Sequence, residues 1–483
     1  MYVGQKFLPY ERTGFLKWAL SPMPTLNFNY DYFIQLGNLP FPLILARLFL
    51  DGGWIPMLVI LIQGFWLLWV QSRQAKFASS VSYCILALNI PRLQEQTPKA
   101  VEQIFSHLSG AYSGLDKYEK YWLGKFQLTF SFELVSIGGY IQYLVHCPKK
   151  YRDLVESSIY AQYPDAEITE VTDYADKVPT TFPHPELDCF GTEFVLKKPH
   201  AYPLRTSEHF EHSAAEVMTF KDPMSSVLEV FSQLKPGEQM WMQILVTPTD
   251  ESWQKKGEEV VDKILGRKKP EKKSMVGEII TGPLWVFKEA GSQLAGVGSA
   301  EGMVEKKPEQ PKMMALSPGE RQVLEEVQKK LSKVGFMCKI RVVYLGRRDL
   351  FSKGRFVSLK GAMSQYSAVN MNGLKGYGPV TPKGDYFWQR WSENGLKGKL
   401  VRNYKNRSGN GAPHYALNIE ELATLYHFPM STVKAPLVKK TESKRAEPPH
   451  SLPTEERYPR AERTKPGETD DDDNEAPANL PFA

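Results

Sequence analysis

The stretch that decides the fold is KFQLTFSFELVSIGGYIQYLVHC, residues 125–147. Both ends of this stretch are rich in Phe, Val, Ile and Tyr, which favour β-strands. Gly138 and Gly139 lie between the two runs, and a glycine pair of this kind is typical of a two-residue turn between antiparallel strands. The stretch therefore predicts a β-hairpin.

The segments on either side of the hairpin complete a known order of elements. A strand-like run at 79–91 and a helical pattern at 97–112 precede it, and a helical pattern at 148–164 and an alternating strand at 166–174 follow it. The order strand, helix, strand, strand, helix, strand is that of the ferredoxin-like fold, with two helices on one antiparallel sheet. We therefore predict a first α+β domain over residues 79–175.

A second α+β domain is predicted over residues 190–370. Its strands and helices are expected at 190–198, 222–234, 237–248, 317–335 and 336–346. An insertion at 267–315 is rich in Lys, Pro, Gly and Glu, a composition that cannot bury enough apolar surface to fold, so we expect it to be disordered. The fold class is thus α+β, with two ferredoxin-like or similar antiparallel sandwiches.

The stretch WIPMLVILIQGFWLLWV, residues 54–70, has no charged residue. Trp54 stands at one end and Trp66 and Trp69 stand near the other, where tryptophans suit a membrane interface. We predict a transmembrane helix at 54–72, preceded by an N-terminal segment at 1–53 that contains an interfacial helix. A helix buried in a protein core is the alternative.

The expected orientation of this span follows from the nearby positive charge. Arg73 and Lys76 come directly after the apolar run, and Arg47 is the one close cation before it. Positive charge favours the cytoplasmic side. We therefore expect a single-pass protein with the bulk of the chain in the cytoplasm, anchored by Trp54, Trp66, Trp69 and Arg73.

Basic charge is concentrated in residues 339–407, which hold fifteen Lys or Arg and three acidic residues, a net of +12 in a chain of net +6. Aromatic residues are interleaved in GDYFWQRW (384–391), as on a surface that tracks phosphates and stacks bases. Anionic lipid, an acidic protein partner and a merely solvated face are the alternatives. The candidate contact residues are Arg347, Arg348, Lys353, Arg355, Arg390, Lys397, Lys399, Arg402, Lys405 and Arg407.

The sequence contains no motif that indicates catalysis, a cofactor or a metal. It has no P-loop pattern, and its four cysteines have no metal-binding or disulfide spacing. His209 and His212 stand close together, but no third ligand is implied nearby. We predict a protein without catalytic residues, cofactor or metal.

The segment at 371–433 ends in LNIEELATLYHFPMST, residues 417–432. Asn418 is a suitable helix cap, and the following apolar residues form a stripe that either docks a partner or closes the protein's own core. The stripe consists of Leu417, Ile419, Leu422, Leu425 and Tyr426. The tail at 434–483 lacks apolar periodicity and is predicted to be disordered.

Four segments resemble a known group of proteins: EQTPKAVEQIFSHLSGA (95–111), YRDLVESSIYAQYPDAEITEV (151–171), GEQMWMQILVTP (237–248) and LNIEELATLYHFP (417–429). They are similar to segments of uncharacterised membrane-anchored proteins of candidate-phyla bacteria, which are encoded with, or fused to, HerA/TraG-like type IV secretion (conjugation) ATPases. The resemblance extends from the apolar run to about residue 452.

The resemblance implies a non-catalytic subunit of a secretion or conjugation machine in the bacterial plasma membrane, which docks a separately encoded hexameric ATPase. It leaves open assembly into a homo-oligomer and contact with DNA. The alternative is a membrane-tethered nucleic-acid-binding protein that acts without a motor.

Overall fold

The computed structural model describes residues 40–90, 96–214, 217–220, 222–265, 316–384 and 386–430. The predicted disordered insertion at 267–315 and tail at 434–483 lie outside the described residues. The chain divides into two units. The first comprises the chain up to Lys76 together with Tyr121–Gly124, and the second comprises Phe77–Lys120 and the chain from Lys125 onward.

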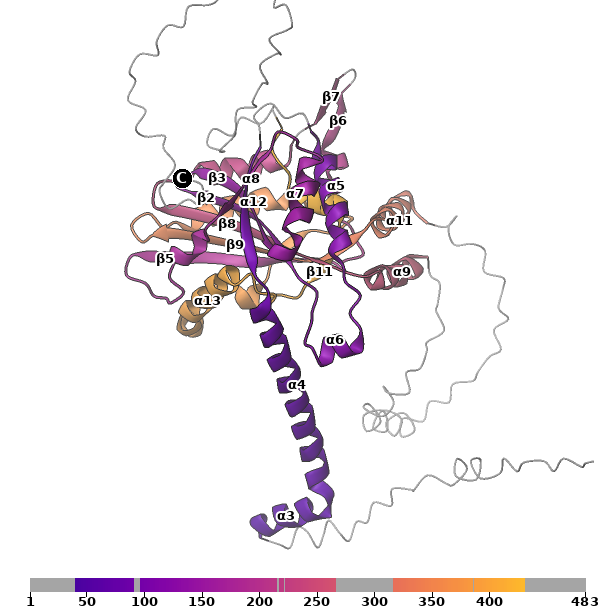
Figure 1. Ribbon diagram of the computed structural model, residues 1–483, viewed down its shortest axis with the longest axis vertical. Helices are drawn as coiled ribbons and strands as arrows, with labels where there is room; N and C mark the ends of the chain where they lie inside the picture. The colour runs from indigo at the N-terminus through magenta and orange to yellow at the C-terminus, as the bar shows by residue number, and fades with distance from the viewer. Residues whose placement is uncertain are drawn as a thin grey trace, which may run out of the picture. The chain divides into compact units, whose positions relative to one another are not determined.

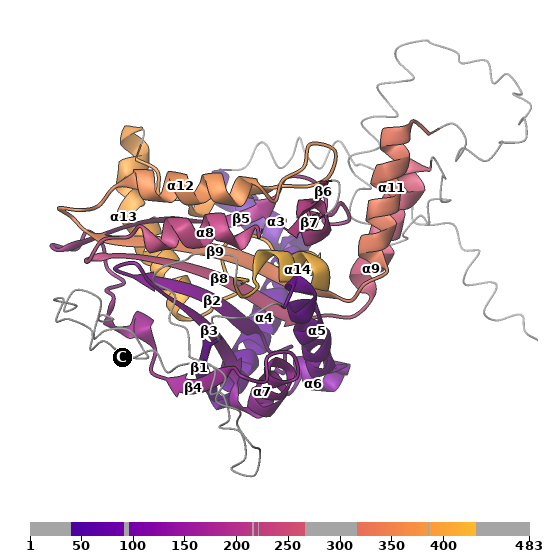
Figure 2. The ribbon, with the colours of Figure 1, turned by 90° about the horizontal axis from the view of Figure 1, so that it is seen from above.

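The hairpin at 125–147 forms as predicted, within a complete βαββαβ unit (Figures 1 and 2). Gly138 and Gly139 both have positive φ, at 60° and 94°, a conformation that favours glycine and closes the two-residue turn. The elements of this half are β1 (Tyr83–Asn89), α5 (Pro98–Leu108), β2 (Phe130–Ile137), β3 (Tyr140–Pro148), α7 (Arg152–Tyr160) and β4 (Glu167–Val171).

A second βαββαβ unit follows, with two insertions. A small hairpin, β6 (Glu211–Ala214) and β7 (Val217–Phe220), precedes its first helix, and α9 (Ser252–Ile264) and α11 (Pro318–Leu331) separate its middle strands. Ser317 caps α11 in a capping box with Glu320. The elements of this half are β5 (Leu187–Leu196), α8 (Met224–Ser232), β8 (Glu238–Pro248), β9 (Gly335–Arg347), α12 (Lys353–Ser364) and β10 (Leu374–Gly376).

The two halves share one continuous antiparallel sheet, which corrects the prediction of two separate sandwiches. The strand order is β10-β5-β9-β8-β2-β3-β1-β4, and β11 (Tyr415–Asn418) extends it beside β9. Each half has its own strands in the ferredoxin-like order fourth, first, third, second. The halves join because β2 pairs with β8, so that the second strand of each half lies inside the sheet instead of at its edge. Every residue of β2 is buried.

The sheet carries a different layer on each face (Figure 2). One face packs under α5, α7, α8, α12 and α14 (Ile419–Leu425), and a single apolar cluster spans both halves there. The other face packs against α13 (Phe387–Lys405) and a short turn at Tyr174–Lys177. Other 3-10 turns lie at Ser109–Ala111, Lys149–Tyr151, Ser207–Phe210 and Gly378–Val380.

The described residues of the first unit are mainly helical. It contains α3 (Phe41–Leu48), a π-helical turn at Phe49–Gly53 and most of α4 (Trp54–Ser80), which runs on into the second unit. Figure 1 shows α3 turned away from the axis of α4. The end of α6 (Lys117–Tyr121) and the residues up to Gly124 also belong to this unit.

Candidate functional site

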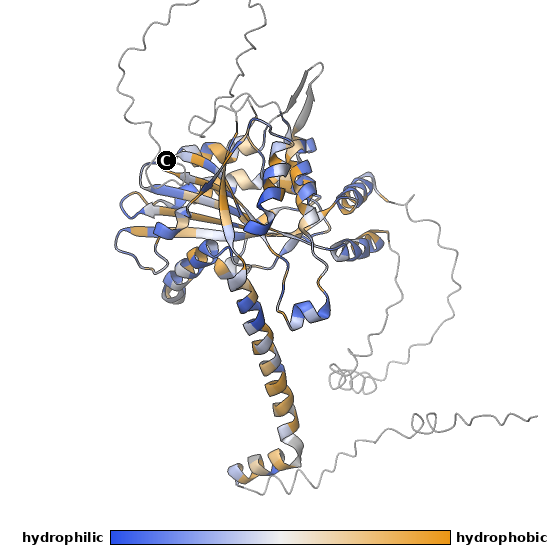
Figure 3. Ribbon diagram, in the orientation of Figure 1, coloured by the Kyte–Doolittle hydropathy of each residue, from blue (hydrophilic) through white to orange (hydrophobic). Residues whose placement is uncertain are grey.

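Helix α4 exposes apolar side chains in every direction around its axis. Ile60, Phe65 and Leu67 are 68%, 70% and 68% exposed, and Figure 3 shows an almost continuous apolar colour along this part of α4. Successive residues of a helix point about 100° apart, so a run of exposed neighbours surrounds the helix. The exposed apolar residues of α4 are Trp54, Ile55, Met57, Leu58, Val59, Ile60, Leu61, Ile62, Phe65, Trp66, Leu67 and Leu68.

An aromatic cluster marks the end of this apolar surface. Trp66 lies against Tyr121, with ring centroids 5.9 Å apart, and Trp69 lies against Trp122 at 5.7 Å. The guanidinium of Arg73 stands 4.5 Å from the centroid of the Trp69 ring, a cation–π contact. Apolar, amphipathic and basic side chains therefore follow one another along the helix.

Gly124 allows the aromatic loop to approach α4 this closely. Its φ is +71°, and a Cβ atom at this position would lie 2.3 Å from the backbone carbon of Arg73. Only a glycine fits such an approach without displacing the backbone.

The predicted transmembrane helix at 54–72 is not supported. Among the described residues, none of the helices has both the length and the apolarity that crossing a membrane requires. The apolar run of α4, residues 54–70, covers about 25 Å, whereas the hydrocarbon core of a bilayer is about 30 Å thick. The remaining turns of α4 are polar and carry Arg73 and Lys76.

The second unit contains a cleft of about 310 Å³. Its lining includes Phe77, Ser82, Phe126 and Tyr151. Lys125, also in the lining, is paired with Glu119 at 2.8 Å. The cleft therefore combines hydroxyl, aromatic and basic groups, and these described lining residues do not include a cysteine or a histidine.

The structure divides the ten predicted basic contact residues into two groups. Six are exposed, namely Arg347, Arg348, Lys353, Arg390, Lys399 and Arg402. The other four are turned to internal partners, so the net charge of +12 overstates the charge available to a partner.

The four internal residues contact groups that are distant in sequence. Lys397 is buried and pairs with Asp188 at 2.8 Å. Arg355 lies 3.6 Å from Glu238, Lys405 donates to the Val178 carbonyl at 3.0 Å, and Arg407 belongs to a buried polar network.

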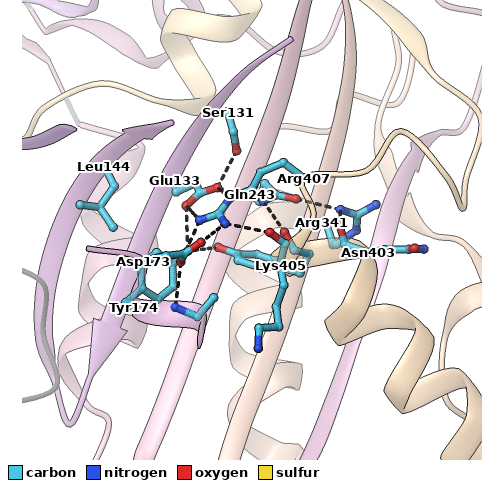
Figure 4. Close-up of polar contacts among 12 residues, drawn as sticks. Ser131, Glu133, Leu144, Asp173, Tyr174, Gln243, Arg341, Asn403, Lys405 and Arg407 are labelled. Atoms are coloured by element: carbon cyan, nitrogen blue, oxygen red, sulfur yellow. Dashed lines mark hydrogen bonds and ion pairs between the residues drawn. The ribbon is translucent and has the colours of Figure 1, made fainter. Parts of the chain in front are cut away.

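This network is a row of polar side chains across four neighbouring strands, and Figure 4 shows three of them, Glu133, Gln243 and Arg341. Glu193 lies opposite Arg341, Arg341 lies opposite Gln243, and Gln243 lies opposite Glu133 in the sheet register. Arg341 Nε donates to Glu193 Oε1 at 2.8 Å, and Gln243 Nε2 donates to Glu133 Oε1 at 3.0 Å. All four residues are fully buried. A slip of one residue between strands would place these groups in the apolar core, so the row fixes the register.

Arg407 pairs with Glu133 at one end of this polar row. Its Nε atom donates to Glu133 Oε1 at 3.0 Å, and it also pairs with Asp173. Burial would raise the pKa of Glu133, but the charge and hydrogen bonds of Arg407 outweigh burial and lower this pKa to about 2. Tyr174 donates to Glu133 Oε2 at 2.9 Å. The carboxylate is thus ionised and fully paired, which indicates a structural group and not a proton donor.

The sequence contains an indication of this buried polar row, but a count of charged residues does not reveal it. Glu133, Gln243 and Arg341 each stand inside a strand in which apolar residues predominate, and charged or amide side chains within such strands are rarely buried unless they are paired. When Arg341 and Arg407 are counted as surface charge, their buried partners go unnoticed.

The predicted docking stripe lies inside the protein's own core. Leu417, Leu422, Leu425 and Tyr426 are buried, as is Ile419, and all five belong to the apolar cluster beneath the helical layer. Asn418 caps α14 as predicted, in a capping box with Glu421. Of the two interpretations, closing the core is the one the structure shows, and these side chains offer no surface to a partner.

Two lysines, one in α11 and one in the turn that follows it, form ion pairs with the acidic first turn of α14. Lys330 pairs with Glu421 at 2.9 Å with both side chains fully buried, and Lys333 pairs with Glu420 at 2.8 Å. The two-helix insertion of α9 and α11 is therefore fastened to the helical layer by charge.

No metal site is present among the described residues: no group of three or more His, Cys, Asp or Glu side chains is placed to hold an ion. The Nε2 atom of His209 lies 3.4 Å from a carboxylate oxygen of Glu326. The buried His427 contacts Asp222 at 2.9 Å and the Ala423 carbonyl.

Comparison with known proteins identifies a family for this fold. No curated protein matches the chain. The model of a family described as a domain of unknown function, DUF8128, matches residues 92–441. This region contains all of the sheet except β1, together with the buried polar row and α13. The match covers most of the chain, and the protein therefore belongs to the DUF8128 family.

Proposed function

We propose that this protein is a non-catalytic scaffold subunit attached to a lipid bilayer by α3 and α4. The observation that carries the proposal is the all-round apolar surface of α4, which ends in the Trp66, Trp69, Tyr121 and Trp122 cluster. A helix that is apolar on every side is stable inside a protein core or in lipid. Aromatic rings followed by Arg73 are the side chains that suit the lipid headgroup region.

The polar groups of the sheet support a scaffold and not an enzyme. Glu133, Glu193 and Arg341 pair with side chains and carbonyl groups inside the fold. Because they are paired in this way, these side chains fix the strand register and are not available to react with a substrate. The large sheet would then serve as a rigid body presented at the membrane.

The resemblance to proteins associated with HerA/TraG-like ATPases supplies the proposed context. We place the scaffold in a type IV secretion or conjugation-like machine of the bacterial plasma membrane, where it holds a hexameric ATPase. Since the stripe from Leu417 to Tyr426 is buried, docking would use exposed surfaces of the second unit. Affinity purification of the tagged full chain after nuclease treatment tests this, with recovery of such an ATPase as the expected result and its absence as the contrary one.

Vesicle flotation of the full chain tests the membrane attachment. The wild-type protein should float with phospholipid vesicles, and the double substitution Ile60→Asp and Leu67→Asp should abolish flotation, because charge on an apolar helix opposes insertion. Val357→Asp is the matched control, since Val357 is 63% exposed on α12 and its substitution should leave flotation unchanged. Wild-type protein that stays out of the vesicle fraction would contradict the proposal.

A nucleic-acid-binding protein without a motor is the second candidate. The exposed residues Arg390, Lys399 and Arg402 on α13 favour it. Binding of this kind weakens steeply with salt because bound counterions are released, so a salt titration of oligonucleotide binding to the full chain distinguishes it.

A further inference from the structure

Three large aromatic side chains are exposed where α13 begins. Tyr386, Phe387 and Trp391 are 57%, 71% and 87% exposed. Isolated exposed apolar residues are ordinary, but a cluster of large aromatics within two turns indicates a contact surface. At the start of the helix the Tyr386 N–H donates to Gln389 Oε1 at 3.4 Å, and the Gln389 N–H donates to the Tyr386 carbonyl at 3.0 Å.

The rest of α13 is held firmly against the sheet. Leu400, Val401 and Tyr404 are buried in the apolar cluster of that face. Lys397 pairs with Asp188 at 2.8 Å and with Glu393 at 3.1 Å. The first half of the helix therefore presents its aromatic residues from a rigid support.

The exposed residues of α13 combine apolar and basic side chains on one element. Phe387 and Trp391 are four residues apart, so they lie on the same face of the helix. Arg390, Lys399 and Arg402 are exposed on the same helix. A similar combination occurs on α4, where Arg73 lies over the ring of Trp69, four residues before it.

We propose that the exposed side of α13 is a second membrane contact, which places Phe387 and Trp391 in the headgroup region of an anionic bilayer. Arg390, Lys399 and Arg402 would then meet the lipid phosphates. This inference rests on the proposed membrane attachment and adds to it that the sheet itself faces the lipid through α13.

Two features favour lipid over a nucleic acid. Proteins that bind single strands stack bases in a groove that follows the phosphate backbone, whereas a side chain that is 87% exposed, as Trp391 is, projects outward from the protein. Interfacial helices combine Trp or Phe with Lys and Arg in this way. Each basic residue near an anionic surface contributes about 1 kcal/mol, so Lys399→Ala together with Arg402→Ala should weaken binding to anionic vesicles roughly thirty-fold.

A fluorescent probe at position 391 of the full chain tests the inference. The four native cysteines are buried, so Trp391→Cys provides a selective labelling site for an environment-sensitive fluorophore. Val357→Cys is the control site, because Val357 is exposed on α12, which covers the opposite face of the sheet. Both labelled proteins are measured with vesicles of phosphatidylcholine and phosphatidylglycerol in equal parts, and with an oligonucleotide.

The expected result is a blue shift and quenching by a lipid-borne quencher at position 391, with no change at position 357. If the protein floats with the vesicles while the probe at 391 stays in water, the inference about α13 is wrong and the attachment through α4 stands. If the protein does not float, both fail. A response of the 391 probe to the oligonucleotide and not to vesicles would replace lipid by nucleic acid.

Discussion

Glu133 and Arg407 are 274 positions apart in the sequence and form a buried ion pair, in which Arg407 Nε donates to Glu133 Oε1 at 3.0 Å and Arg407 Nη2 donates to Glu133 Oε2 at 3.2 Å. The pair connects a strand of the first half with the residues that follow α13. It therefore couples the two halves of the sheet on the face opposite the helical layer.

Removal of Arg407 should destabilise the protein strongly. Arg407→Met leaves the buried carboxylate of Glu133 without its counter-charge, which costs about 3–5 kcal/mol of unfolding free energy. Arg347→Met is the matched control, because Arg347 pairs with Asp349 at 2.6 Å on the surface, where such pairs contribute at most about 1 kcal/mol. Urea unfolding of the two variants measures both changes in unfolding free energy. Equal changes would show that the buried pair contributes no more to stability than the surface pair.

The free energy of unfolding should fall in two steps as the pH is lowered. Burial, together with the nearby charge of Arg407, lowers the pKa of His146 from 6.5 to about 4. The unfolded chain therefore binds a proton at His146 that the folded protein does not, so stability is lost between pH 6.5 and about 4. The pKa of Glu133 is lowered from 4.5 to about 2, so the folded protein loses further stability between pH 4.5 and about 2.

His146→Gln separates these two steps. The variant should lose the dependence of unfolding free energy on pH between 6.5 and 4, which amounts to roughly 3 kcal/mol, and should keep the loss at lower pH. Urea unfolding at a series of pH values is the measurement. An unchanged slope in the variant would assign the first step to another group.

Truncation of Leu422 should test the place of α14 in the core. Its side chain is fully buried, and Leu422→Ala removes packed apolar volume, which costs about 2–5 kcal/mol. Val357→Ala on the exposed face of α12 should change the unfolding free energy by no more than about 0.5 kcal/mol. A neutral Leu422→Ala would mean that the helix is not part of the core.

Oxidation should link Cys84 to Cys147. These residues are directly opposite in the β1–β3 register, and their Sγ atoms are 3.6 Å apart. The reaction should be slow, because burial raises the pKa of the Cys147 thiol and the thiolate is the reacting form.

Mass spectrometry after oxidation of the folded protein and alkylation under denaturing conditions detects this link. Cys189 and Cys338 should stay alkylatable, and Cys147→Ala should restore alkylation of Cys84. Four free thiols after prolonged oxidation would show that the strands hold the sulfurs too rigidly to bond.

Local patterns carried most of the fold prediction. The glycine pair at 138–139, the cap at Asn418 and the alternation of strands and helices all act over a few residues. They predicted the first βαββαβ unit, the start of α14 and the α+β class of the second half. The pairing of β2 with β8 was not predicted, since no feature in the sequence of either strand specifies which strand it pairs with. One hint was the apolar character of both strands, which suits an interior position better than an edge.

The candidate site was harder to predict than the fold, because a count of charged residues does not show which of them form ion pairs inside the protein. Lys397 and Arg407 were assigned to an outward basic surface, but each faces carboxylates that are distant in sequence. The apolar stripe from Leu417 to Tyr426 fits a core and an interface equally well by pattern alone. Only the three-dimensional arrangement distinguishes these cases.

The join between β2 and β8 has a consequence for synthesis on the ribosome. After Ile137 ends β2, a hundred residues must be translated before Glu238 begins β8, which takes roughly 5–20 s at ordinary elongation rates. Once Val171 has completed β4, the first half can fold, but it presents an open and largely apolar strand edge to other nascent chains. The strand order therefore leaves the β2 edge of the newly made first half uncovered until the second half supplies β8.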